Sequence, residues 1–67
     1  MIMSVTSRNR NKTPKSFRLE AVNEDERFVL ARLHFTIALD ARNFKPIAHV
    51  GNPRTEKIDE LELEIAR

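Results

Sequence analysis

The chain contains no cysteine, so neither a disulfide framework nor a thiolate metal site can stabilise it. It also lacks tryptophan and tyrosine, and it has one glycine and three prolines. No apolar run approaches the roughly 18 residues of a membrane span, and the opening MIMSV is too short for a signal-peptide core. We therefore expect a soluble, cytoplasmic protein without membrane association.

Signatures of catalysis are missing as well. No phosphate-binding loop or metal-ligand cluster appears, and the serines, threonines and histidines are too scattered for a nucleophilic triad. The acids of the last twelve residues would lie on a solvated face rather than in the sheltered cleft that acid–base catalysis needs. We expect no enzyme, no catalytic residues, no cofactor and no metal ion.

The chain is short, with 67 residues. A domain of this size buries only about 60% of its unfolded surface, so burial and conformational entropy nearly cancel. Without disulfides or a metal, the remaining source of stability is self-association or a partner. This balance predicts a homodimer.

Charge is distributed unevenly along the chain. The first 19 residues contain no acid and carry five of the twelve basic residues, whereas the rest holds all ten acids. Residues 1–14 are rich in Ser, Asn, Thr, Arg and Lys and offer little to bury after Val5. Such a composition cannot repay the entropy of ordering, so we expect a disordered basic arm over 1–14 and one small domain over 15–67.

Alternating apolar residues predict strands in the domain. The first strand covers about 16–22, where Phe17 and Leu19 alternate with polar residues, and the third covers about 44–50. Between them, 27–40 reads as a middle strand that ends in the turn DARN. In the resulting hairpin register, Leu39 faces Phe44 and every pair on one face is apolar. The pattern therefore favours a three-stranded antiparallel meander.

A long central helix over 24–42 remains an alternative. Asn23 followed by Glu26 fits a capping box, and the segment is rich in good helix formers. However, this helix would be apolar over more than half its circumference, which is awkward for a surface helix in a short chain.

The last segment should cover the apolar face of the sheet. Thr55 can cap a helix over about 56–66, with Ile58, Leu61 and Ile65 on one side. The predicted class is therefore α+β. Because LELEI alternates perfectly, a four-stranded all-β fold remains open.

The basic arm carries the main functional signal. Arginine and lysine with interspersed amides and hydroxyls suit contacts to phosphates. We expect a non-enzymatic regulator of transcription that binds duplex DNA through the arm and the polar face of the sheet. The predicted contacts are Arg8, Arg10, Lys12, Lys15, Arg18, Arg27 and Lys45.

The two histidines and the acidic C-terminal segment lead to two further hypotheses. The predicted register places His34 opposite His49, which would form a pH-sensitive pair but no metal site, since no third ligand lies nearby. The alternative function is a small protein-binding regulator or inhibitor, of the type found in mobile elements and phages, that docks on a host protein. Its interface would be the acidic C-terminal segment or an exposed sheet edge.

Overall fold

The computed structural model describes residues 1–40 and 42–66 and contains a four-stranded antiparallel sheet with one α-helix. The expected α+β class is confirmed, but the helix lies in the middle of the chain. The elements follow in the order β1 (Ile2–Arg8), β2 (Pro14–Glu20), α1 (Glu24–Leu39), β3 (Phe44–Asn52), the short 3₁₀ helix η1 (Pro53–Thr55) and β4 (Lys57–Ile65).

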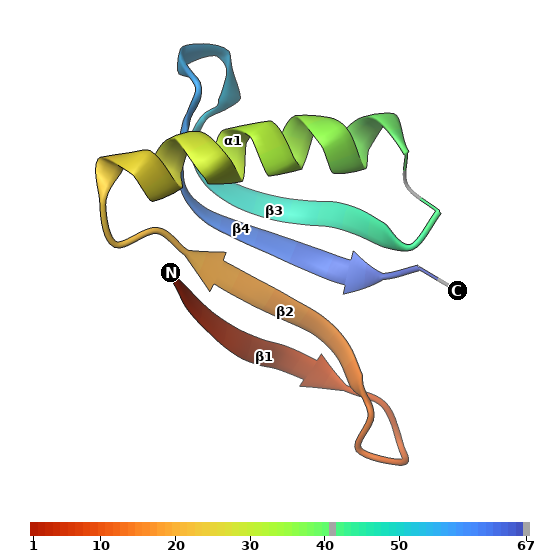
Figure 1. The fold of residues 1–67 in the computed structure, drawn as a ribbon. Coiled ribbons are helices and arrows are strands. Elements are labelled where there is room, and N and C mark those ends of the chain that lie inside the picture. The colour runs from red at the N-terminus through yellow and green to blue at the C-terminus, as the bar shows by residue number, and fades with distance from the viewer. Residues whose placement is uncertain (41, 67) are drawn as a thin grey trace.

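The strands are arranged in the order β1-β2-β4-β3, so the last strand of the chain lies inside the sheet. Strands β2 and β3 flank β4, and α1 connects them across one face (Figure 1). The helix packs mainly against β4 and also touches β3. Within the described parts of the chain, no helix has the length and apolar character needed to cross a lipid bilayer.

The predicted helix over 56–66 is wrong, and the alternative of a fourth strand there is right. Leu61 and Leu63 pair with Leu19 and Phe17 of β2, while the intervening glutamates point to the other face. This period-2 pattern outweighs the helix propensity of Glu and Leu because it matches neighbours on both sides. Thr55 does not cap a helix: its hydroxyl donates to the carbonyl of Asn52 and closes the β3–β4 connection.

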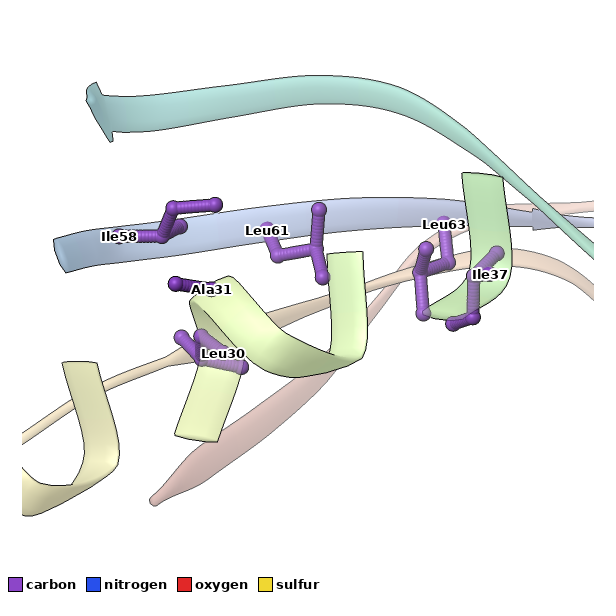
Figure 2. Packing of buried hydrophobic residues seen from close by; sticks show 6 residues of the cluster. All are labelled: Leu30, Ala31, Ile37, Ile58, Leu61 and Leu63. Carbon is purple, nitrogen blue, oxygen red and sulfur yellow. The ribbon is translucent and has the colours of Figure 1, made fainter. Parts of the chain in front are cut away.

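The hydrophobic core lies between α1 and β4. Figure 2 shows the buried side chains of the two elements facing one another. Burying one such side chain contributes about 1.5–3 kcal/mol, and partly buried apolar side chains of β2 and α1 pack against this small cluster. Its members are Leu30, Ala31 and Ile37 from the helix and Ile58, Leu61 and Leu63 from β4.

The predicted middle strand over 27–40 is also wrong, because this segment forms α1. The side chain of Asn23 accepts a hydrogen bond from the backbone of Glu26 at 2.9 Å, and Glu26 in turn accepts one from the amide of Val22. These bonds satisfy donors that the first helical turn leaves free. The helix ends at Leu39, near the end of the alternative helix over 24–42; Ala41, in the predicted DARN turn, lies outside the described residues.

The segment resembled a strand because α1 carries apolar residues on its outer side as well. Leu30 and Ile37 face the sheet, whereas Phe28, Phe35 and Leu39 are 47%, 64% and 75% exposed. Along the sequence, the apolar residues of the inner and outer sides of the helix together produce the alternation that is typical of a strand. The structure thus contains the nearly all-round apolar helix that the sequence analysis judged awkward.

The N-terminal segment is not a free arm, since residues 2–8 form strand β1 at the edge of the sheet. Met3 pairs with Leu19, and Val5 pairs with Phe17, so the apolar row of β2 extends into β1. Pairing with β2 provides hydrogen-bond partners for the backbone of β1 and contacts for its side chains. The expectation of disorder considered only the composition of the segment. The strands expected over 16–22 and 44–50 are present as β2 and β3, and Pro46 lies on an edge strand as its missing N–H requires.

Replacing the cap residue tests whether α1 is a helix. We expect Asn23→Ala to lower the free energy of unfolding by about 0.5–2 kcal/mol, because the first turn loses its side-chain acceptor. Asn23→Ser should retain most of the stability, since a serine hydroxyl caps helices well. Chemical denaturation followed by circular dichroism measures both, and equal stability of all three proteins would contradict this account of the helix start.

Candidate nucleic-acid interface

The turn between β1 and β2 is ordered by its own hydrogen bonds. The amide of Asn9 donates to the carbonyl of Thr13, and the amide of Lys12 donates to the carbonyl of Asn9, both at 3.0 Å. The side chain of Asn9 also accepts from the amide of Thr13 at 3.1 Å. These contacts give the segment between the strands a defined shape rather than that of a flexible tip.

Lys12 adopts a left-handed backbone conformation in this turn, with φ of 64°. Three-residue hairpin loops often combine a type I turn with one left-handed residue, usually glycine or asparagine. The side chain of Arg8 supports the strained position by donating to the carbonyl of Lys12 at 2.9 Å. A lysine therefore occupies a position where glycine would be conformationally easier.

Four basic residues that the sequence analysis selected lie on or beside this turn. We call Arg8, Arg10, Lys12 and Lys15 the basic hairpin. Lys15 lies beside Ile65 at the end of β4, and Phe44 pairs with Ile65 from the other side. The basic hairpin, the start of β3 and the end of α1 therefore share one end of the molecule (Figure 1).

The sequence analysis missed Arg42, which follows α1 at this same end. Its guanidinium contacts both carboxylate oxygens of Asp40, at 2.9 and 3.1 Å, and this hydrogen-bonded pairing lowers the pKa of Asp40. The signal for Arg42 was its place in the DARN turn. That segment was interpreted only as a hairpin connection.

The opposite end of the molecule is acidic. The first turn of α1 carries three acids in succession, and the end of β2 and the start of β4 add more beside it. The basic residues at this end are largely paired: Lys57 lies 2.8 Å from Glu24, and Arg27 lies 2.6 Å from Asp59. Charge is thus separated along the 38 Å axis of the molecule. The acids concerned are Glu20, Glu24, Asp25, Glu26, Glu56, Asp59 and Glu60.

The other three predicted contacts do not join the basic hairpin. Arg27 lies near the start of α1, at the acidic end. The Nε atom of Arg18 lies 3.5 Å from Glu20 and 3.6 Å from Glu60, inside the sheet. Lys45 is the second residue of the edge strand β3 and pairs with Glu64, so that β4 lies between it and β2.

The open face of the sheet is acidic, whereas the predicted polar face was expected to contact DNA phosphates. Two rows of paired residues cross this face from β1 through β2 and β4 to β3. The first row consists of Ile2, Glu20, Glu60 and Val50. The second row consists of Ser4, Arg18, Glu62 and Ala48. The third row contains Ser16, Glu64 and Lys45. Arg27, one of the predicted contacts, is absent from this face because it belongs to α1.

This face shows little relief. An open hollow of about 200 Å³, bordered by Arg18, Val50, Glu60 and Glu62 among others, lies below the usual size of a small-molecule site. Within residues 1–40 and 42–66, no group of three or more His, Asp or Glu side chains is placed to hold a metal ion. The described surface therefore offers charge and shape rather than a cleft.

The predicted pair of histidines does come together, although not across two strands. His34 of α1 packs on His49 of β3 with ring centroids 5.2 Å apart. Burial lowers the pKa of His34, and the nearby His49 lowers it further. The helix-to-sheet contact thus produces the proximity that the wrong register predicted.

Comparisons of the chain with protein-family models, with curated proteins and with solved structures gave no significant match.

The lowered pKa of His34 predicts a pH dependence of stability. Because the folded state disfavours the protonated ring, the unfolded state binds more protons just below the ordinary histidine pKa of about 6.5. Stability should fall as the pH falls from about 7 to 5, and His34→Gln should flatten this decline. Urea unfolding at several pH values measures it; an unchanged decline in the variant would refute the role of His34. Carboxylates with lowered pKa values, such as Glu24, add to the loss of stability only at more acidic pH.

Proposed function

We propose that this protein is a non-enzymatic regulator that binds duplex DNA through the basic hairpin. The observation that carries the proposal is the gathering of Arg8, Arg10, Lys12 and Lys15 on one ordered turn, remote from the acidic end. Lysine and arginine that neutralise phosphates release counterions, and this release dominates the affinity of such contacts.

The shape of the hairpin supports the same function. Two-stranded β-ribbons fit the major groove of B-DNA, and a tip with basic side chains can follow the phosphates on either side. Asn11 and Thr13 in the turn add polar groups that can donate to phosphate or base edges. The fixed turn would bind with a smaller loss of entropy than a disordered arm.

The charge separation also sets an orientation. The acidic face of the sheet and the acidic start of α1 would be repelled by phosphates, whereas the basic hairpin would be attracted. The protein would therefore approach DNA end-on, with its long axis pointing away from the duplex. This differs from the flat contact through a sheet face that the sequence predicted.

Docking to a host protein is the second candidate, and the open face of the sheet favours it. Glu20, Glu60, Glu62 and Glu64 lie on this face together with the exposed apolar side chains of Ile2 and Val50. A basic protein surface with a few apolar contacts would complement this pattern.

Titration of labelled duplex DNA at several salt concentrations tests the leading proposal. If about four phosphates are contacted, a fourfold increase in salt should weaken binding roughly a hundredfold. Arg10→Ala and Lys12→Gly should each reduce the salt slope by about one, because each removes one phosphate contact. Glycine suits the left-handed position of Lys12, so the second variant removes charge without straining the turn.

Arg54→Ala is the matched control. Arg54 lies in η1 at the acidic end, and its replacement removes one positive charge at a position remote from the basic hairpin. We expect its salt slope to equal that of the unaltered protein. If it weakens binding as much as Arg10→Ala does, net charge rather than the basic hairpin governs affinity; no binding at low salt would instead favour the protein-docking function.

A further inference from the structure

We propose that two copies of the chain associate through the outer side of α1, with their helices antiparallel. The surface concerned consists of Phe28, Arg32, Phe35 and Leu39, which we call the outer ridge. The juxtaposition that carries the proposal is this exposed apolar row on α1, between an acidic first turn and the end of the molecule that holds the basic hairpin.

The outer ridge is too apolar for a free helix surface. Phe35 and Leu39 are exposed over most of their area, although Leu30 and Ile37 already bury the inner side. A helix that is apolar all round is normally buried all round. Taking roughly 200 Å² for a phenylalanine, the ridge exposes on the order of 400 Å² of apolar surface, which is large for a monomer this small.

The spacing of the ridge matches that of helices that pack lengthwise. Asp25, Phe28, Arg32, Phe35 and Leu39 follow one another at alternating steps of three and four, which places them on one stripe. Side chains at such positions fit between those of a facing helix. A second copy of α1 presents the same stripe.

An antiparallel pair makes the stripe complementary to itself. With a two-fold axis midway between Leu33 and His34, Phe28 faces Leu39 of the second copy. Arg32 then faces Phe35 of the second copy, where a guanidinium can stack on the ring. Every apolar residue of the ridge finds a partner in this register.

Charge complementarity selects the same arrangement. The acidic end of one copy lies beside the end of the other copy that holds its basic hairpin. A parallel pair would instead place the acidic first turns together, which costs free energy. The lengthwise charge separation of the molecule thus favours an antiparallel two-fold dimer.

The edges of the sheet offer poorer routes to a dimer. Strand β3 has Pro46, which lacks an N–H, and its register shifts twice along β4. Strand β1 carries shifts between Val5 and Arg8. Prolines and bulges on edge strands hinder the addition of another strand.

Sedimentation over a dilution series tests the proposal. We expect the protein to sediment at about twice its 7.8 kDa and to dissociate on dilution, because the interface is small. Phe35→Lys should sediment as a monomer with unchanged circular dichroism, since Phe35 is already exposed in the single chain. Val50→Lys adds the same charge on the open sheet face and should remain dimeric.

A monomeric unaltered protein at all concentrations would overturn the proposal, as would a dimeric Phe35→Lys variant or a monomeric Val50→Lys variant. Should Phe35→Lys fail to fold, Leu39→Lys provides the same test at a more exposed position.

Cross-linking tests the register separately. The chain has no cysteine, so single cysteines can be introduced without competition. A mixture of Phe28→Cys and Leu39→Cys chains should form a disulfide between the two variants on oxidation, because these positions face one another. Neither variant alone should cross-link, since like positions would lie about 16 Å apart along the helix axes. Cross-linking of either variant with itself would overturn the register.

Discussion

Strand β4 is the element on which the other elements depend. It alternates leucine and glutamate between β2 and β3, and its residues from Glu60 to Glu64 pair with both of these strands. Leu61 and Leu63 supply the surface on which α1 packs, and Glu60, Glu62 and Glu64 set the charge of the opposite face. The division of the molecule into a helix-covered side and an acidic side therefore follows from nine consecutive residues.

Local signals predicted part of this architecture. Alternation identified β2 and β3, and the Asn23–Glu26 pair marked the start of α1, although the helix was ranked second. The ranking failed because Phe35 and Leu39 are apolar yet face outward, which no single-chain argument about burial anticipates. The C-terminal segment failed for a different reason: its alternation was visible, but its central place in the sheet depends on partners distant in sequence.

The sequence predicted several residues of the candidate site correctly, but it did not predict how they are arranged in space. Four of the seven basic positions lie together because residues 1–14 fold back along β2 instead of remaining free. Arg18 and Arg27 were assigned by their charge and by their place on the predicted sheet, and their carboxylate neighbours Glu60 and Asp59 are more than thirty residues away in sequence. The sequence gives the sign of the charge on each side chain, whereas the ion pairs that a side chain forms depend on the completed fold. The histidine contact shows the converse, since His34 and His49 meet although the interpretation that paired them was wrong.

The central position of β4 has a consequence for biosynthesis. When the ribosome has released only the first four elements, β2 and β3 have no strand between them, and Leu30 and Ile37 have no leucines to pack on. Nascent chains of this kind cannot gain stability step by step as they emerge, because the contacts that close the sheet span the greatest separations in the sequence. Packing of α1 on the complete sheet therefore requires that β4 has left the exit tunnel, and until then Leu30 and Ile37 on the inner side of the helix are exposed.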